Sequence, residues 1–182
     1  MKIIDTPLTE VKIIEPCVFG DDRGFFYENW NQRTFAELDL DLKFVQDNHS
    51  KSARGVLRGI HYQIERPQGK LVRVTAGAVY DVAIDLRRSS PQFGHWAGFR
   101  LDSVNKHMLW VPPGFGHGFL SLEDNTEFLY RCTDFYSPES ERSLLWSDVQ
   151  LDIDWPLDKV NEPVLSAKDA AGVPFAQAEI YS

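Results

Sequence analysis

The chain of 182 residues is 43% hydrophobic and 25% charged, which suits one globular domain with a hydrophobic core. Its formal net charge is −8 and it contains no run of lysines and arginines, which argues against a protein that binds DNA or RNA along a basic face. No apolar stretch approaches the roughly 20 residues that a membrane-spanning helix needs. The two cysteines, Cys17 and Cys132, stand far apart and without a pattern, as free thiols do in a reducing compartment. We therefore expect one domain over residues 1–182, in a cytoplasmic protein that associates with neither nucleic acid nor membranes.

The first part of the chain predicts short strands, one hairpin and one helix. Residues 11–15 form a short extended segment that a proline ends. Residues 18–28 contain Asp-Asp-Arg-Gly before an aromatic stretch and predict a hairpin, in which Gly24 is free to take a positive φ. Residues 31–38 predict a helix capped by an asparagine. Residues 44–50 place polar residues after a short apolar start, and we expect a loop there.

Beyond residue 56 the chain turns to closely spaced strands. In residues 79–86 one face is apolar and the other mixes two aspartates with small residues, which indicates a polar face that need not be exposed. Pro-Pro-Gly at 112–114 predicts a type II turn between two strands. Many short strands joined by Gly and Pro turns predict an all-β fold, an antiparallel β-sandwich or jelly roll with a few short helices. The strands are expected over residues 71–75, 79–86, 96–101, 107–111, 119–122 and 127–135.

Two helical segments are predicted towards the C-terminus. Residues 137–141 read as one turn of helix with a proline at its first position. Residues 164–172 carry a compact helix signature, in which Ser166 caps the first turn and Asp169 reaches back to it. Gly172 then ends the helix.

A polar stretch in the strand-forming part of the chain indicates a site. It supplies a fixed cation, a titratable imidazole, an amide and an amine, from Arg58, His61, Gln63 and Lys70. Such side chains are expected in a strand when they point into a site. Simple strand alternation places Arg58 and His61 on opposite faces, and a bend at Gly59 would bring them together.

The histidines do not form a metal-binding pattern. Jelly rolls of the cupin kind often bind a metal through two histidines spaced one residue apart, and Gln63 stands where the second is expected after His61. No HxH or HxxxH spacing occurs, so we expect no metal. His61 then remains as an acid–base candidate, because imidazole titrates near neutral pH, although a lone histidine is more often structural. With no nucleophile elbow and no glycine-rich phosphate loop, proton transfer is the reaction class that is left.

Six segments form a specific pattern when they are taken together: FGDDRGFF at 19–26, VQDNHS at 45–50, LRGIHYQ at 57–63, QGKLVR at 68–73, PGFGHGF at 113–119 and LSAKD at 165–169. In order and spacing they resemble the dTDP-4-dehydrorhamnose 3,5-epimerase family over nearly the whole chain. The resemblance implies a cupin-type jelly roll without metal or cofactor, in a homodimer. It implies a dTDP-linked 4-keto-6-deoxy sugar as substrate, inverted at C3 and C5 beside the C4 ketone to give dTDP-4-dehydro-L-rhamnose for dTDP-L-rhamnose biosynthesis.

The resemblance also implies catalytic roles. By the family's pattern His61 is the base, and Asp169 orients it and stabilises its protonated form. Lys70 faces the developing enolate oxygen, where a fixed cation acts most strongly on the transition state. Tyr130 returns a proton from the opposite face, which turns exchange into inversion. We further expect Asp81 to support His61 or Lys70.

The other matches surround the sugar, the diphosphate and the base. Arginine suits a diphosphate because its fork holds two oxygens at once, and Tyr136 matches the residue that stacks on the thymine ring. In the family part of the nucleotide site comes from the neighbouring subunit, so Arg23 and Glu28 are expected to act across a dimer interface. The substrate-binding positions are Arg23, Glu28, Gln46, Asn48, Arg58, Lys70, His117, Tyr136, Glu141 and Lys168.

Other functions share much of this pattern. Relatives that invert only C3 or C5 of another dTDP-4-keto deoxysugar keep nearly the same motifs, although Tyr130 favours the full epimerase. A cupin that binds sugar nucleotides without catalysis and a metal-dependent cupin oxygenase are alternatives from other classes, because one fold hosts many functions. The set of His61, Lys70, Tyr130 and Asp169 favours the enzyme.

Overall fold

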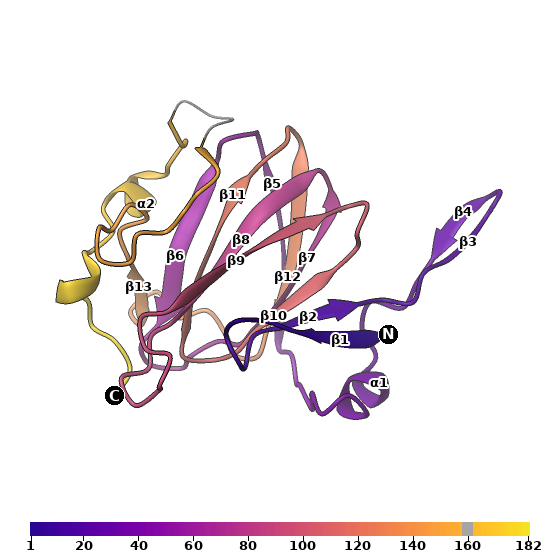
Figure 1. Ribbon diagram of the computed structural model, residues 1–182, viewed down its shortest axis with the longest axis horizontal. Coiled ribbons are helices and arrows are strands. Elements are labelled where there is room, and N and C mark those ends of the chain that lie inside the picture. Colours follow the sequence, from indigo (N-terminus) through magenta and orange to yellow (C-terminus); the bar gives the residue numbers. More distant parts are fainter. Residues whose placement is uncertain (158–161) are drawn as a thin grey trace.

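The computed structural model describes residues 1–157 and 162–182, and its strands form two antiparallel sheets that lie face to face (Figure 1). The six-stranded sheet has the order β1-β2-β10-β7-β12-β5, and the five-stranded sheet has the order β13-β6-β11-β8-β9. A separate hairpin, β3–β4, projects from one end of the body (Figure 1). This arrangement, with its few short helices, confirms the predicted all-β jelly roll.

The elements have the following bounds. The six-stranded sheet consists of β1 (Lys2–Asp5), β2 (Lys12–Glu15), β10 (Met108–Val111), β7 (Lys70–Ala76), β12 (Thr126–Cys132) and β5 (Gln46–Ser52). The five-stranded sheet consists of β13 (Glu141–Ser143), β6 (Leu57–Gln63), β11 (Phe115–Ser121), β8 (Ala78–Asp85) and β9 (Trp96–Asp102). The remaining elements are β3 (Phe19–Asp21), β4 (Gly24–Phe26), α1 (Gln32–Ala36), α2 (Ala167–Ala170) and the 3-10 helix η2 (Phe175–Gln177).

The main core lies between the two sheets and is lined by alternate residues of their strands. Val72 of β7 and Phe128 of β12 meet Ala83 of β8 and Phe119 of β11 in one buried cluster. The rings of Phe119 and Phe128 stack with their centroids 4.2 Å apart. This packing closes one end of the space between the sheets, so the polar residues farther along the same strands can line a cavity.

Strand β8 is buried on both of its faces, and the sequence had left burial of its polar face open. Ala83 faces the core between the sheets, whereas Val82 and Ile84 pack against a second cluster on the outer face of the five-stranded sheet. The C-terminal segments cover that outer face with residues such as Trp155. Asp81, on the inner face of β8, is fully buried. A buried carboxylate needs a partner, and its partner is found in the site.

Helix α1 is a short, capped helix that anchors the chain after the hairpin. The side chain of Asn31 accepts hydrogen bonds from the first main-chain N–H groups of the helix, as predicted. Phe35 is fully buried in a third cluster, with Leu71 and Trp110, on the outer face of the six-stranded sheet. Neither this helix nor any other in the described residues is long and apolar enough to cross a membrane.

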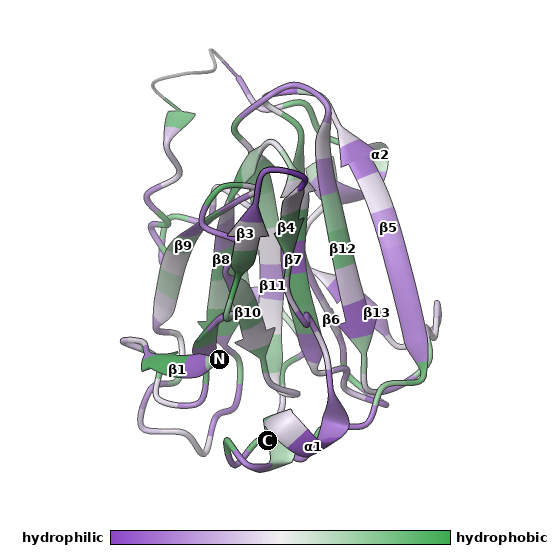
Figure 2. Ribbon diagram, turned by 90° about the vertical axis from the view of Figure 1, so that its right-hand side faces the viewer, coloured by the Kyte–Doolittle hydropathy of each residue, from purple (hydrophilic) through white to green (hydrophobic). Residues whose placement is uncertain are grey.

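The expected loop at 44–50 is wrong, because residues from Gln46 onward form strand β5. The strand pairs with all of β12 at the edge of the six-stranded sheet. Its residues alternate between half-buried and exposed positions, with Gln46 and Asn48 among the half-buried ones. The inner face is polar because it lines a cavity rather than the core, so the hydrophobic alternation that signals a strand is missing. Figure 2 shows β5 as a hydrophilic strand at the edge of the sandwich.

Two other expectations need correction. The predicted helical turn at 137–141 is instead a single hydrogen-bonded turn, in which Ser140 N donates to Ser137 O at 3.1 Å, and it is followed by β13. Pairing of β13 with β6 satisfies more main-chain groups than one isolated helical turn would.

The strand expected at 119–122 begins earlier, at Phe115, since β11 also includes the glycine-rich segment before it. A side chain at Gly118 would place its Cβ 2.9 Å from Arg58 O, so only glycine permits this approach of β11 to β6.

Candidate active site

A cavity of about 430 Å³ opens between the two sheets. Both sheets contribute to its walls, and the loop before β13 and the N-terminus of α2 form part of its rim. Polar and ionisable side chains make up most of its lining: Gln46, Asn48, Ser50, Arg58, His61, Lys70, His117, Tyr130, Tyr136, Glu141, Ser166 and Asp169, with Phe119 and Phe128. The structure thus brings together most residues that the sequence assigned to the site.

Arg58 and His61 both line this cavity because β6 is irregular between them. His61 pairs with His117 and Arg58 pairs with Phe119, so β6 uses one residue more than β11 over the same span. Gly59 has a φ of +113° within this bulge. The bend that the sequence suggested at Gly59 is therefore present, and it directs both side chains into the same cavity.

His61 and Asp169 form a close pair at the rim. His61 Nε2 lies 2.7 Å from Asp169 Oδ1. Asp169 is only 3% exposed, and Gly59 N and Ser166 Oγ donate hydrogen bonds to its two oxygens at 3.0 and 2.6 Å. Burial alone raises the pKa of Asp169, but the contacts with His61, Ser166 and Gly59 outweigh it and hold the pKa well below the ordinary value. The carboxylate therefore stays ionised and fixes the imidazole.

The pair depends on α2, which the sequence predicted. Ser166 is the N-cap of this helix, and its Oγ accepts the hydrogen bond of Asp169 N at 3.1 Å. The same hydroxyl donates to the Asp169 carboxylate. Ser166 thus both caps the helix and holds the carboxylate that contacts His61.

Tyr130 and Lys70 stand on the opposite sheet from His61. Tyr130 lies on β12, next to Asn48 of β5. Burial raises the pKa of its phenol, which keeps it protonated at neutral pH. Burial lowers the pKa of the Lys70 ammonium, while neighbouring acidic groups, among them Glu141 and Asp81, oppose that effect. The cavity is therefore flanked by an imidazole on one sheet and by a phenol and an amine on the other.

Asp81 contacts His117 rather than His61. His117 Nε2 lies 2.9 and 3.0 Å from the two oxygens of Asp81, and both residues are buried. Burial raises the pKa of Asp81, and His117 and Lys70 act against that rise. Of the two partners expected for Asp81, Lys70 thus acts on it only through its charge. His117 and His61 are register partners on adjacent strands, so two histidine–aspartate pairs lie side by side.

A chain of polar contacts links the loop before β13 to α2 at the rim. Tyr136 Oη donates to Glu141 Oε2 at 2.6 Å, and Lys168 Nζ forms an ion pair with the same oxygen. The hydrogen bond to Glu141, with a smaller effect of burial, raises the pKa of Tyr136 to about 12. Lys168 does not itself line the cavity, but it fixes Glu141, which does.

Polar residues of β5 and Arg58 of β6 line the cavity from the two different sheets. Gln46 Nε2 donates to Asn48 Oδ1 at 3.1 Å. Arg58 Nε donates to Ser52 Oγ at 3.2 Å. Within residues 1–157 and 162–182 no carboxylate forms an ion pair with Arg58, which leaves its guanidinium available to an anionic ligand.

Arg23 and Glu28 lie outside the cavity. Arg23 is an exposed residue of the β3–β4 turn and pairs with Asp21 of the same hairpin. Glu28 accepts hydrogen bonds from Asn31 and Thr34 at the start of α1, at 2.9 and 3.2 Å. Within one chain, the structure does not bring these two residues to the rest of the predicted site.

The described part of the chain contains no group of three or more His, Cys, Asp or Glu side chains arranged to hold a metal ion. Gln63, which replaces the second histidine of a metal-binding cupin motif, does not line the cavity. Its amide is bound to the main chain of two loops. His61 and His117 each contact a carboxylate instead.

Comparisons with known proteins agree with this geometry. A family model for dTDP-4-dehydrorhamnose 3,5-epimerase matches residues 5–177. The dTDP-4-dehydrorhamnose 3,5-epimerase of Pseudomonas aeruginosa is 56% identical over 182 residues, which cover 100% of this chain and 99% of that protein.

Solved structures give the same result. A crystal structure of dTDP-6-deoxy-D-glucose-3,5-epimerase from Legionella pneumophila, in complex with dTDP-4-keto-L-rhamnose, is 50% identical with a TM-score of 0.94, covering 98% of this chain and 94% of that one. A 3'-monoepimerase from Streptomyces bikiniensis, in complex with dTDP-quinovose, is 34% identical with a TM-score of 0.89, covering 96% and 88%. The chain therefore belongs to the dTDP-4-dehydrorhamnose 3,5-epimerase family.

Proposed function

We propose that the protein is a cofactor-independent epimerase that converts dTDP-4-dehydro-6-deoxy-D-glucose to dTDP-4-dehydro-L-rhamnose in dTDP-L-rhamnose biosynthesis. The observation that carries this proposal is the placement of the His61–Asp169 pair and of Tyr130 on opposite sheets across one cavity. Inversion at carbon requires a proton to leave from one face and return to the other. A base and an acid on facing walls are suited to that reaction.

In the proposed mechanism the C4 ketone acidifies the protons on C3 and C5. Neutral His61 takes one of these protons, and the electron pair of the C–H bond moves into the ketone to form an enolate. Asp169 stabilises the imidazolium that results. Tyr130 then donates its proton to the opposite face of the carbon as the enolate returns to the ketone. Repetition at the second carbon, with proton exchange with water between the steps, completes the reaction without a redox change.

Lys70 is proposed to stabilise the enolate oxygen. A cation that is already in place when negative charge develops lowers the barrier, and it does so most strongly where water is excluded. Lys70 is partly buried, which limits its contact with water, and the negative charges of Glu141 and Asp81 favour its protonated form. These neighbours therefore help to keep a partly buried amine cationic.

The nucleotide is proposed to lie along the rim. Arg58 is suited to the diphosphate because it has no carboxylate partner in the described chain and faces the cavity. Tyr136 is half exposed, and its ring is suited to stack on thymine. Gln46, Asn48, His117, Glu141 and Lys168 are proposed to bind or position the rest of the substrate.

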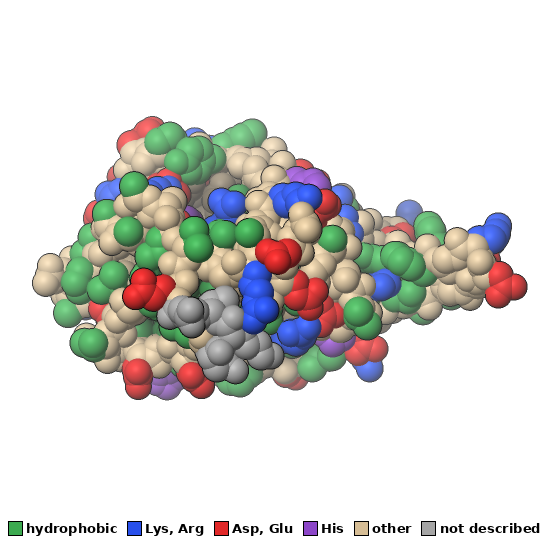
Figure 3. Space-filling view, turned by 90° about the horizontal axis from the view of Figure 1, so that it is seen from above, with side chains coloured by type: hydrophobic (Ala, Val, Ile, Leu, Met, Phe, Trp, Pro, Cys, Tyr) green, Lys and Arg blue, Asp and Glu red, His purple; other side chains and the backbone are tan. Residues whose placement is uncertain are grey.

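The homodimer is part of the proposal, and the β3–β4 hairpin supports it. Phe25 and Phe26 are 63% and 70% exposed on this projection, together with Phe19. Figure 3 shows the projection reaching away from the body, with hydrophobic side chains along it and charged ones near its tip. Exposed aromatic residues next to charges are typical of a surface that docks on a partner. A second copy would cover this hairpin and receive Arg23 and Glu28 near its own cavity.

A deuterium experiment tests the reaction. The 4-keto-6-deoxyglucose nucleotide, incubated with the protein in heavy water, should take up deuterium at both C3 and C5 and give the inverted sugar. Label at a single carbon would show a mono-epimerase, the activity named for the Streptomyces bikiniensis relative. Binding seen by calorimetry without any exchange would show a non-catalytic sugar-nucleotide-binding protein.

A further inference from the structure

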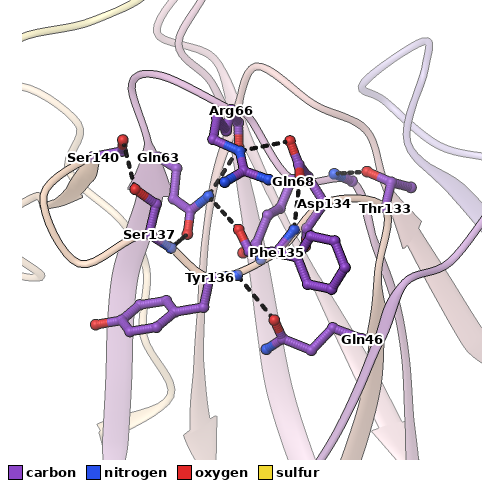
Figure 4. A network of polar contacts seen from close by, with 11 residues as sticks. Gln46, Gln63, Arg66, Gln68, Thr133, Asp134, Phe135, Tyr136, Ser137 and Ser140 are labelled. Carbon is purple, nitrogen blue, oxygen red and sulfur yellow. Dashed lines mark hydrogen bonds and ion pairs between the residues drawn. The ribbon is translucent and has the colours of Figure 1, made fainter.

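The loop between β12 and β13 carries Tyr136, and a network of polar contacts holds its main chain (Figure 4). Gln63 lies at the centre of this network. It is the last residue of β6, two positions after His61. Its side chain is only 3% exposed and takes no part in the cavity lining. None of the roles assigned above uses this buried amide.

The carboxamide of Gln63 forms three hydrogen bonds, and all three partners are main-chain groups. Its Nε2 donates to Arg66 O at 2.8 Å and to Phe135 O at 3.2 Å. Its Oε1 accepts from Ser137 N at 2.9 Å. Two donors and one acceptor are thereby satisfied, and two of the three contacts lie directly before and after Tyr136.

The peptide nitrogen of Tyr136 itself is held from the other sheet. Tyr136 N donates to Gln46 Oε1 at 2.9 Å, and Gln46 belongs to β5. The ring of Tyr136 points away from these contacts (Figure 4) and is half exposed, with its hydroxyl on Glu141. The main chain is therefore fixed between the two sheets, while the ring is open to a ligand.

We propose that Gln63 is a positioning residue, which fixes the peptide groups on both sides of Tyr136 and so holds its ring ready to stack on a nucleotide base. The inference rests on the proposed function, which supplies the dTDP-linked ligand. A platform that is ordered before the ligand arrives loses little conformational freedom on binding, and affinity rises accordingly. The proposal also gives a role to the glutamine that stands in place of a metal-binding histidine.

The test compares Gln63→Met with Gln68→Met. The first substitution keeps the approximate shape of the side chain and removes all three hydrogen bonds, which leaves buried main-chain groups unpaired next to Tyr136. Gln68 holds the same loop through one hydrogen bond, Nε2 to Asp134 O at 2.8 Å, and serves as the matched control. The dissociation constant for dTDP, measured by calorimetry, should rise roughly tenfold in Gln63→Met and less than about twofold in Gln68→Met. Equal losses in both variants would overturn the proposal.

A double-mutant cycle separates positioning from general support of the fold. In a Tyr136→Ala background, Gln63→Met should weaken dTDP binding by less than about twofold, because the ring that Gln63 positions is gone. A further tenfold loss in that background would overturn the proposal. In steady-state kinetics Gln63→Met should raise KM and leave kcat nearly unchanged. A fall in kcat at constant KM would show that Gln63 acts on His61 instead.

The binding measurement keeps this inference apart from the proposed function. Wild-type protein that binds dTDP but fails to epimerise would contradict the function and leave the Gln63 comparison valid. Unchanged dTDP affinity in Gln63→Met would contradict the inference even if the wild type is active. If Gln63→Met does not fold, amide hydrogen exchange of the wild-type protein tests the proposal instead. The Ser137 amide should be protected before dTDP is added, and protection that appears only with dTDP would overturn the proposal.

Discussion

The cavity and the β3–β4 hairpin carry two parts of the proposed site, and they are built in opposite ways. His61 and Tyr130 stand on strands that are paired on both sides within a sheet, and buried carboxyl or aromatic groups surround them. The hairpin consists of two three-residue strands that pair only with each other, and its phenylalanines are exposed. We infer that the groups for proton transfer are complete within one chain, because they must be held rigidly. The nucleotide end of the site is proposed to be completed by a second chain.

The largest expected effect is on the cavity side of this comparison. His61→Asn removes the proposed base and retains a polar side chain of similar size. Deuterium uptake at C3 and C5 should fall about 10³-fold, a typical contribution of a general base, whereas the dissociation constant for dTDP should change little. Mass spectrometry of the recovered sugar nucleotide measures the first quantity and calorimetry the second. Exchange at a normal rate would remove His61 from the role of base.

Much of this arrangement was accessible from the sequence because it rests on local signals. The turn at Gly24, the cap at Asn31 and the cap at Ser166 each depend on a few adjacent residues, and all three are present. The alternation of residues likewise predicted strand β8, although it left the burial of its polar face open. The roles of His61 and Asp169 came from the family pattern, since nothing local marks a helix cap as the partner of a histidine far along the chain.

Features that depend on register were not predictable in the same way. Asp81 and His117 contact each other because β8 and β11 are neighbours, and their positions are offset by two residues in the ladder. Asn48 lies in an edge strand whose inner face is polar, so its pattern resembles that of a loop. The sequence offered a bend at Gly59 as one of two possibilities, and only the pairing of β6 with β11 decides between them. Sequence patterns report local burial, whereas these contacts are set by pairing across the sheets.

The next effect tests whether the two facing sheets divide the reaction between them. Tyr130→Phe removes the proposed acid and leaves His61 in place, so proton removal should continue and inverted product should be lost. Product formation should fall about 10²-fold, while deuterium uptake falls less. Chromatography of the product and mass spectrometry of the remaining substrate measure the two rates. Equal loss of both would count against Tyr130 as the acid.

A smaller effect concerns the support of His61. Asp169→Asn should lower kcat/KM by about 10- to 100-fold, as loss of an orienting carboxylate does. Because the pKa of Asp169 is lowered in the folded protein, its contribution to stability is complete above the ordinary aspartate pKa of about 3.9 and is lost as the pH falls through the folded-state pKa.

Urea unfolding at several pH values checks the stability part of that prediction. Wild type should be more stable than Asp169→Asn at pH 7, and the difference should shrink in strong acid. Asp41→Asn, at an exposed position after α1 and outside the hairpin, is the control and should show no such difference. A gap between wild type and Asp169→Asn that stayed constant with pH would mean that the carboxylate charge is not what stabilises the fold.

The smallest expected effect concerns Arg23 in the hairpin, and it tests whether this residue acts in the cavity of its own chain or in that of a second chain. Arg23→Ala should raise KM about tenfold through loss of a charge-assisted contact, with kcat nearly unchanged. When Arg23→Ala and His61→Asn proteins are mixed and allowed to exchange subunits, mixed dimers should contain one site with both residues intact. Activity with the wild-type KM should then return to about a quarter of the wild-type level, because half of the dimers are mixed and each has one intact site. If Arg23 served the cavity of its own chain, every site in the mixture would lack one of the two residues, and no wild-type KM would appear. Return of that KM on mixing therefore requires that the hairpin of one chain completes the cavity of another.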